Sequence, residues 1–257
     1  MPLFVNKINI VIPMAGQGKR FIEAGYLTPK PLLKLGDELI IKHIVNVMRV
    51  PQAQFIFIVR QDHCDEFQLD KILLEIEPYA KIVKTNQLTQ GSVCTVLLAK
   101  DFINDENPII IKDCDQIANW TPENFLEFVE RNRADGAIIN IHTDRPNYSF
   151  SRVNSKGQII ETAEKSVISN HGSVGIYYFA KGSDFVKYAE RMIVKNIKVN
   201  NEFYTAPVYN QFIQDFKTIL HYPVAEMFQL GTPEEFFENK QKAIDFLERK
   251  NQKPQVL

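Results

Sequence analysis

Short apolar runs alternate with amphipathic stretches along the first half of the chain. Buried strands are predicted for the apolar runs, which are residues 8–12, 54–59, 81–83 and 108–112. Helices are predicted where apolar residues recur at helical spacing, which is at residues 39–48, 62–77 and 92–102 and after Thr121-Pro122. Strands that alternate with helices in this way predict an α/β fold with a doubly wound, mostly parallel sheet.

From about residue 136 the pattern becomes richer in strands. Strands and hairpins are predicted at residues 137–142, 148–153, 158–163, 174–179 and 218–224. Helices are predicted at residues 183–195, at 201–216 with a break near Pro207, and from Thr232 to about Arg249, where Thr232 and Glu235 have the spacing of a capping box. We therefore expect a single domain, residues 1–257, in which the half 1–135 is doubly wound and the half 136–257 is a smaller, mixed and β-rich portion.

The polar residues after the first strand form a phosphate-binding pattern. Residues 13–21 are Pro-Met-Ala-Gly-Gln-Gly-Lys-Arg-Phe, and Thr28-Pro29-Lys30-Pro31 follows. Glycines let a backbone approach phosphate closely, free N–H groups can donate to it, and Lys and Arg supply positive charge. A dinucleotide-binding G-x-G-x-x-G is excluded because its third glycine position is Phe21. A Walker A loop is excluded because Gly18-Lys19 is followed by Arg20 rather than by Ser or Thr.

This pattern resembles the signature of the sugar-phosphate nucleotidylyltransferases, which is A-G-G-x-G-x-R followed by P-K-P. Arg20 and Lys30 stand where that family has them, although its first glycine pair is loosened here to Ala15-Gly16. The resemblance implies a Rossmann-like nucleotidyltransferase fold, similar to that of GT-A glycosyltransferases. It also implies that the first half binds a nucleoside triphosphate through Met14, Ala15, Gly16, Gln17, Gly18 and Lys19.

Two acidic residues follow the inner strand. Alternation is expected to place Asp113 and Asp115 on one face of the sheet. Carboxylates at a strand end near a phosphate loop suit Mg²⁺, which also takes oxygens from phosphates and water. Both are metal candidates, and Asp115 better matches the metal-binding Asp of the resembling family. Gln229 stands where many members have a second such Asp, so Asp113 or Glu226 takes that role, or a single carboxylate suffices.

The resemblance continues through the second half and implies an acceptor site. Glu164-Lys165 looks like the family's Glu-Lys pair, in which Glu holds an acceptor hydroxyl and Lys holds the acceptor phosphate. Other matching segments are Tyr148-Ser149-Phe150, Ser173 to Tyr177, Asn201 to Tyr204 and Leu230 to Glu234. The acceptor residues implied by this match are Tyr148, Ser149, Glu164, Ser173 and Glu202, with Lys165 as a catalytic residue.

The segment from Thr89 to Ser92 departs from the resembling family. It replaces a proline- and glycine-rich run that faces the nucleotide base, which leaves the identity of the base open. Gln90 and Gly91 are candidates for contacting the base, and Gly91 could equally be no more than a helix start. The variant pattern looks closest to cytidylyltransferase-like enzymes of bacterial capsule and surface-polymer synthesis, which favours CTP.

Composition narrows the classes of function. The 257 residues are 45% hydrophobic and carry a formal net charge of −1, so the chain can bury a substantial core and shows no basic field for nucleic acid. No apolar stretch is long enough to span a membrane, and the N-terminus lacks the apolar core of a signal peptide. Three widely spaced cysteines indicate reduced thiols. We expect a cytoplasmic protein with no nucleic-acid or membrane partner, and a homo-oligomer is left open.

The expected reaction transfers a nucleoside monophosphate from a nucleoside triphosphate to a sugar phosphate or another small phosphorylated metabolite, with release of pyrophosphate. The acceptor phosphate is largely dianionic at neutral pH, so positioning and charge neutralisation suffice. Arg20 is expected to hold the departing phosphates, Lys30 the transferred group and Lys165 the acceptor phosphate. Two alternatives stay open: a nucleotide-sugar-dependent GT-A glycosyltransferase, for which Asp113-Cys114-Asp115 has the Asp-x-Asp form, and an inactive nucleotide-sensing module.

Overall fold

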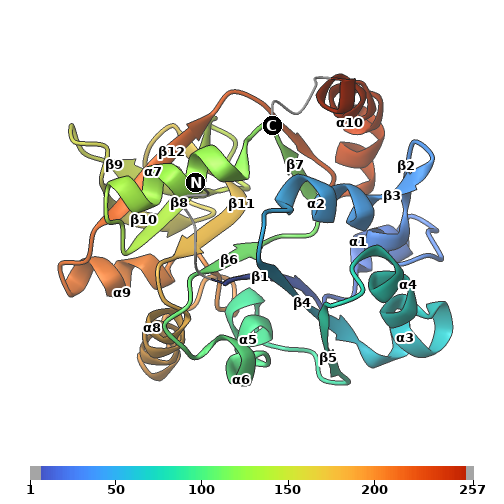
Figure 1. Ribbon diagram of the computed structural model, residues 1–257, viewed down its shortest axis with the longest axis horizontal. Coiled ribbons are helices and arrows are strands. Elements are labelled where there is room, and N and C mark those ends of the chain that lie inside the picture. The colour runs from blue at the N-terminus through green and yellow to red at the C-terminus, as the bar shows by residue number, and fades with distance from the viewer. Residues whose placement is uncertain (1–6, 253–257) are drawn as a thin grey trace.

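A nine-stranded sheet runs through the computed structural model, which describes residues 7–252 (Figure 1). Its strands are β1 (Ile8–Met14), β4 (Ala53–Arg60), β5 (Lys81–Thr85), β6 (Ile109–Lys112), β8 (Gly136–His142), β9 (Ser149–Val153), β10 (Ile159–Glu164), β11 (His171–Phe179) and β12 (Ile219–Val224). Along the sheet their order is β10-β9-β11-β6-β1-β4-β5, and β8 pairs with β11 and with β12. Two shorter antiparallel pairs are β2 (Lys34–Leu35) with β3 (Glu38–Leu39) and β7 (Gln116–Ala118) with β13 (Met227–Gln229).

Helices cover both faces of the sheet. One face carries α2 (Ile40–Met48), α3 (Gln61–Phe67), α4 (Leu69–Ile76), α7 (Pro122–Arg131) and α10 (Pro233–Gln252). The other face carries α5 (Ser92–Leu97), α6 (Lys100–Ile103), α8 (Gly182–Val194) and α9 (Val208–Gln214). The connection from β1 to α2 contains α1 (Lys19–Glu23) and the 3₁₀ helix η1 (Lys30–Leu32). Figure 1 shows α2 and α7 above the strands and α5, α6 and α8 below them, so the predicted α/β fold is confirmed.

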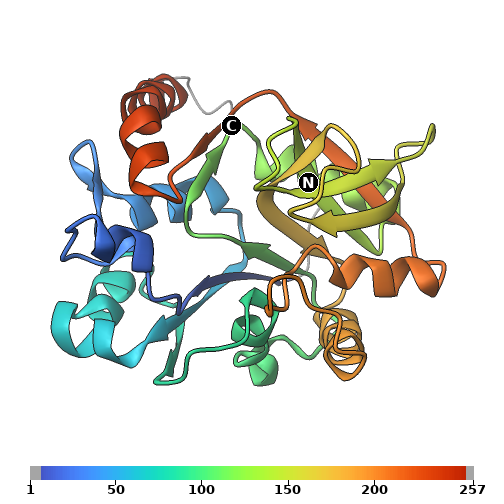
Figure 2. The same ribbon diagram turned by 180° about the vertical axis from the view of Figure 1, so that it is seen from behind.

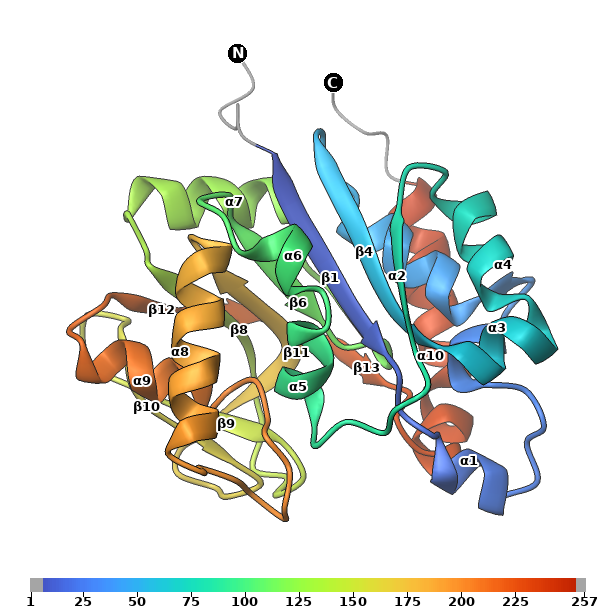
Figure 3. The same ribbon diagram turned by 90° about the horizontal axis from the view of Figure 1, so that it is seen from below.

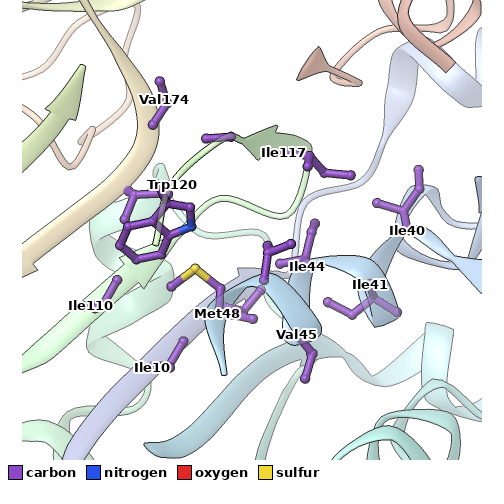
Figure 4. Close-up of a cluster of buried hydrophobic side chains, with 14 of the residues drawn as sticks. Ile10, Ile40, Ile41, Ile44, Val45, Met48, Ile110, Ile117, Trp120 and Val174 are labelled. Carbon is purple, nitrogen blue, oxygen red and sulfur yellow. The ribbon is translucent and has the colours of Figure 1, made fainter. Parts of the chain in front are cut away.

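The inner strands divide their side chains between two apolar clusters. In β1, Ile10 points into the cluster under α2 and α7, whereas Val11 points into the cluster under α5 and α8. Figure 4 shows Ile44 and Met48 of α2 in the same cluster as Ile10 and Trp120. These four side chains and that of Val11 are each at most 3% exposed. Burial on both faces explains the almost wholly apolar inner strands, and it fixes β1 and the loop that follows it.

The four strands that the first half contributes to the large sheet, β1, β4, β5 and β6, run parallel to one another. β4 and β5 lie on one side of β1 and β6 lies on the other, so the order of strands reverses at β1. Figure 3 shows β1 and β4 side by side and pointing the same way, toward α1. The connections after β1 and β6 therefore leave the same edge of the sheet in opposite directions, which opens a crevice between them.

The second half of the sheet is mostly antiparallel. β11 pairs antiparallel with β6, β8 and β9, whereas β12 runs parallel to β8. Figure 2 shows the first half (blue to cyan) and the strands of the second half (yellow) at opposite ends of the molecule, with α10 (red) back beside the first half. There the ring of Phe236 lies 6.4 Å from that of Phe21 in α1, between centroids. The division of the chain near residue 136 stays a prediction.

A bridging segment, residues 199–205, joins the second half to the first. The Phe203 backbone N–H donates to the Gln90 carbonyl at 2.8 Å, and the Phe203 carbonyl accepts from the Val93 N–H at 3.0 Å. Gly91 makes this docking possible, because its φ is +106° and its missing Cβ leaves room for the Phe203 backbone.

Three predicted helices are shorter than expected. The helix at 62–77 is split into α3 and α4 by Gln68, whose φ of +55° interrupts the helical backbone. The helix at 92–102 is split into α5 and α6 because Ala99, at φ −93° and ψ 14°, leaves helical geometry. The helix at 201–216 is reduced to α9, because the bridging segment gives its backbone hydrogen bonds to other partners.

The predicted capping box is confirmed on one side, since the Glu235 N–H donates to Thr232 Oγ1 at 3.2 Å. α10 continues to Gln252 rather than ending near Arg249, and Thr121 precedes α7 without a side-chain capping bond. Among the helices of residues 7–252, none combines the length and the apolar character that crossing a membrane requires.

The variant Gly91→Ala should be less stable than the wild type. The added Cβ would lie 2.6 Å from both the backbone N and the backbone O of Phe203, and a φ of +106° disfavours an L side chain. We expect a loss of roughly 2 kcal/mol in the free energy of unfolding, measured by denaturant titration. Gly16→Ala is the matched control, since its Cβ would meet nothing within 4 Å. Equal stability of the two variants would show that the bridging segment does not depend on Gly91.

Two neighbouring histidines should make stability depend on pH. The rings of His171 and His221 have centroids 4.6 Å apart, and Nδ1 of His221 lies 3.0 Å from Oδ1 of Asn140. Burial first, and then the neighbouring His171, lowers the pKa of His221 from 6.5 to about 4. Because the folded state then binds fewer protons than the unfolded state, this contribution is complete above pH 6.5 and is lost as the pH falls toward 4.

We therefore expect the midpoint of thermal unfolding to fall between about pH 7 and about pH 5, and to fall less in His221→Gln, which cannot take up a proton. Circular dichroism at the two pH values measures the midpoints. An equal fall in both proteins would contradict the role of His221.

Candidate active site

A cleft of about 1050 Å³ opens at the carboxyl ends of β1 and β6 and is lined by residues of both halves. The predicted site residues that line it are Met14, Ala15, Gly16, Gln17, Gly18, Lys19, Arg20, Lys30, Gly91, Asp113, Asp115, Tyr148, Ser149, Glu164, Lys165, Ser173 and Glu202. Gln90 does not line the cleft: its side chain is exposed, and its carbonyl is held by the bridging segment. Residues far apart in the sequence are thus brought to one site.

The loop after β1 presents its backbone to the cleft. Met14 and Ala15 are buried and anchor the loop, whereas Gly16 and Gly18 are exposed. Within the described part of the chain, the amides of residues 16–18 donate no hydrogen bond to another backbone group. Gly18 has a φ of +64°, which turns the chain into α1. Free amides beside the exposed side chains of Lys19 and Arg20 form a cradle for an anion.

Lys30 and Asp115 form an ion pair in the cleft. Lys30 Nζ lies 2.7 Å from Asp115 Oδ2, and the two side chains are 17% and 26% exposed. Lys30 begins η1 between two prolines, which restrict the backbone that aims it. Burial alone would lower the pKa of Lys30 and raise that of Asp115, but their mutual attraction outweighs it, so the pKa of Lys30 is raised and that of Asp115 is lowered. Both groups therefore stay charged at neutral pH.

Asp113 has a different set of neighbours, and the expectation that the two aspartates share a strand face is wrong. β6 ends at Lys112, so Asp113 and Asp115 lie in a turn where strand alternation does not hold. The Asp113 N–H donates to the Gly175 carbonyl at 2.9 Å. Burial first, and then the charge of Asp115, raises the pKa of Asp113 to about 7.

Lys112 is a buried cation that sequence reasoning missed. It is 0% exposed, and its Nζ donates to the Asp113 carbonyl at 2.6 Å. Burial lowers its pKa, whereas the charges of Asp113 and Asp115 oppose that shift. A lysine at the end of an inner strand was the available signal. Through its hydrogen bond to the Asp113 carbonyl, the side chain supports the turn that follows β6.

Two glutamines face each other beside this turn. Gln116 of β7 and Gln229 of β13 are direct partners in the antiparallel pair. Both line the cleft, and the Oε1 atom of each is buried without a hydrogen-bond partner among the described residues. The Leu230 N–H, directly after β13, donates to the Asp115 carbonyl at 2.8 Å and so also holds the turn. Glu226 does not line the cleft, and its carboxylate lies 3.5 Å from Asn119 Nδ2.

Three of the predicted acceptor residues, Ser149, Glu164 and Ser173, are buried polar residues on the second half of the cleft. The Ser149 hydroxyl donates to the Glu164 carboxylate and lies 3.5 Å from the Tyr177 hydroxyl. Ser173 Oγ accepts from the Gly175 N–H at 3.1 Å. Burial raises the pKa of Glu164, and the hydrogen bond from Ser149 opposes that shift. This pocket offers oxygen acceptors and hydroxyl groups to a ligand.

Lys165 lies at the boundary between this pocket and the bridging segment. Its φ is +52°, a strained value for a residue other than glycine, and its N–H donates to the Tyr148 carbonyl at 2.9 Å. Its Nζ donates to the Tyr204 hydroxyl at 2.5 Å. Glu202 lines the cleft from the same bridging segment. The ammonium of Lys165 is thus held at the edge of the pocket.

Comparisons with known proteins agree with this arrangement. A family model described as nucleotidyl transferase matches residues 10–244. The bifunctional protein GlmU of Buchnera aphidicola subsp. Schizaphis graminum is 24% identical over 208 residues, which are 79% of this chain and 43% of that protein. The mannose-1-phosphate guanyltransferase of Yarrowia lipolytica is 23% identical over 174 residues, which are 65% of this chain and 48% of that protein. The chain thus spans about half the length of these curated relatives.

A solved structure is similar over almost the whole chain. The crystal structure of a nucleoside-diphosphate-sugar pyrophosphorylase from Vibrio cholerae RC9 matches with a TM-score of 0.77 and 25% identity. The match covers 90% of this chain and 99% of that one. Together with the family model, which spans most of the sequence, this result confirms the resemblance first suggested by the loop after β1. The chain belongs to the nucleotidyl transferase family.

Proposed function

We propose that this chain is a nucleotidyltransferase, which transfers a nucleoside monophosphate from a nucleoside triphosphate to a small phosphorylated acceptor and releases pyrophosphate. The observation that carries the proposal is the Lys30–Asp115 ion pair, which lies in the same cleft as the loop of residues 16–20 and the pocket around Glu164. A fixed cation and a fixed carboxylate between a phosphate-binding loop and an acceptor pocket suit a reaction at the phosphorus that passes between them.

In the proposed reaction, an oxygen of the acceptor phosphate attacks the α-phosphorus. A new P–O bond forms, and the bond from the α-phosphorus to the bridging oxygen breaks, so that pyrophosphate leaves with that electron pair. The free amides of residues 16–18, with Lys19 and Arg20, hold the departing β- and γ-phosphates. Lys30 stabilises the charge on the transferred group, and Lys165 holds the acceptor phosphate.

Two oxygen donors in the cleft suit a magnesium ion. Asp115 offers a carboxylate, and Gln229, in the same cleft, has an Oε1 atom that lacks a partner in the described residues. Such hard oxygen donors are what Mg²⁺ takes from proteins, with phosphate and water completing its shell. We assign Asp115 and Gln229 to hold the ion, which would neutralise charge on the transferred phosphoryl group when bound.

Among nucleotides we propose CTP, and among roles the cytoplasmic synthesis of precursors for bacterial capsule or surface polysaccharide. The support is the departure of the segment from Thr89 to Ser92 from the family pattern, and the position of Thr89, Gly91 and Ser92 in the lining of the cleft. Release of pyrophosphate separates this function from that of a glycosyltransferase, whose sugar-nucleotide donor has no such leaving group, and from that of a nucleotide sensor.

Lys30→Ala and Asp115→Ala should each lower turnover by at least about 100-fold, because each removes a charge from the reacting centre. The assay is magnesium-dependent release of pyrophosphate from ATP, CTP, GTP or UTP with glucose 1-phosphate, mannose 1-phosphate, inositol 1-phosphate or phosphoethanolamine. EDTA should abolish the release. Circular dichroism checks that both variants are folded.

The matched controls are Lys34→Ala and Asp37→Ala, which change exposed residues of the same types and should keep wild-type turnover. Turnover within about tenfold of the wild type in Lys30→Ala or Asp115→Ala would remove that residue from the reaction. Wild-type protein that releases no pyrophosphate with any pair of substrates would favour the sensor.

A further inference from the structure

Asp113 and Asp115 are separated by one residue but meet different surroundings. Asp115 pairs with Lys30, and its Oδ2 lies 3.2 Å from the position that a Cβ on Gly231 would take. Asp113 instead faces Gly175, where its Oδ2 lies 2.8 Å from the equivalent Cβ position. The two carboxylates therefore serve different parts of the cleft, Asp115 at the ion pair and Asp113 against β11.

Gln116 converges on the same point as Asp113. Its Oε1 atom lies 2.0 Å from the Cβ position of residue 175, which only a glycine leaves open. Gly175 has a φ of +67°, so both its conformation and its lack of a side chain are required here. The absent Cβ thus brings an amide and a carboxylate together at one place in the lining of the cleft.

The side-chain oxygen atoms of these two residues accept no hydrogen bond from the described part of the chain. Gln116 is 9% exposed, and its Oε1 has no partner among the described residues. The backbone of Asp113 is held at both ends, by Gly175 at 2.9 Å and by Lys112 Nζ at 2.6 Å, while no donor to its carboxylate is found within residues 7–252. Buried polar atoms in folded proteins normally have partners, so unmet acceptors that line a cleft point to a donor on a ligand.

We propose that Asp113 and Gln116 form a second recognition subsite of the acceptor pocket, which takes a hydrogen-bond donor, a hydroxyl or an ammonium group, at the end of the acceptor remote from its phosphate. This inference rests on the proposed function, since it describes how the second substrate is selected. The subsite adjoins the polar group around Glu164, because Ser149 contacts both Glu164 and Tyr177, and Ser173 accepts from the Gly175 N–H.

The charges of this region exclude other kinds of ligand group. Asp113 and Glu164 are both acceptors, Lys30 is paired with Asp115, and the buried Lys112 donates to the Asp113 carbonyl. Lys165 is assigned to the acceptor phosphate, so it does not serve the remote end of the acceptor. A carboxylate on the acceptor would be repelled, and an apolar end would leave the amide and the carboxylate without partners. A polyol phosphate or an amino-alcohol phosphate supplies the donors that fit.

Equilibrium binding tests the subsite without turnover. Isothermal titration, without nucleotide or metal, measures glucose 1-phosphate, inositol 1-phosphate and phosphoethanolamine against ethyl phosphate, which lacks a donor at its remote end. We expect the wild type to bind at least one of the three at least tenfold more tightly than ethyl phosphate. Asp113→Asn and Gln116→Met should each lower that affinity roughly tenfold and leave the affinity for ethyl phosphate unchanged. The first replaces one carboxylate oxygen with an NH2 donor, and the second replaces the amide with an apolar side chain.

Kinetics give the second readout and separate the subsite from a metal-binding role. In both variants the KM for the acceptor should rise roughly tenfold, while the KM for the nucleotide and the magnesium requirement stay within about twofold of the wild type. Asp101→Asn and Gln241→Met, on exposed helical residues, are the controls.

Two results would overturn the inference. One is a wild type that binds every probe no better than ethyl phosphate; the other is Asp113→Asn with unchanged acceptor affinity and a raised magnesium requirement, which would make Asp113 a metal ligand. If selective binding is found but no pyrophosphate is released, the subsite stands and the proposed transfer reaction fails.

Discussion

The position of β6 beside β1 is the constraint on which the rest of the structure depends. The two parallel strands pair Asn9 with Ile109 and Val11 with Ile111, so their carboxyl ends lie at one edge of the sheet. The strands that follow β1 in the chain are added on its other side, and the connections from β1 and β6 therefore diverge. The loop of residues 16–20 and the turn at residues 113–115 open into the space between them. Neither segment would form a site without the other.

That turn also concentrates charge in a poorly solvated place. Lys30 and Lys112 oppose Asp113 and Asp115, and Lys112 is completely buried. Buried ions are costly unless they are paired, so each lysine offsets a cost that the aspartates would impose alone. An apolar turn would be easier to stabilise. The retention of four ionisable side chains here is better explained by the reaction that they are proposed to serve than by the stability of the fold.

Local patterns predicted the parts of the fold that local forces determine. β1 and β6 are buried on both faces, and such strands are apolar runs that can be recognised without any partner. The break at Gln68 could not be predicted, because glutamine is a good helix former and nothing in the local sequence marks its left-handed conformation. The loss of helix after Asn201 likewise results from hydrogen bonds to Gln90, which lies in the other half of the chain.

The residues of the candidate site divide in the same way, into those that a local motif predicts and those that only the fold brings together. Arg20, Lys30 and Asp115 could be predicted because a short motif follows each strand. The surroundings of Asp113 could not, because strand alternation stops where β6 ends at Lys112, and because only the fold brings Gly175 and Gln116 to it. Lys112 shows the same limit. A lysine in a strand is usually an exposed residue, and only the turn that follows explains its burial.

The return of the chain to its own beginning bears on when the cleft can be completed. The Leu230 N–H bonds to Asp115, and Phe236 of α10 packs against Phe21 of α1, so the last elements support the first ones. A polypeptide emerging from the ribosome builds its N-terminal elements first. Until residues 230–236 have been synthesised, the loop of residues 16–20 and the turn at residues 113–115 lack this support. A nascent chain would therefore expose the residues of the proposed phosphate-binding loop well before it could hold them in the geometry of the finished fold.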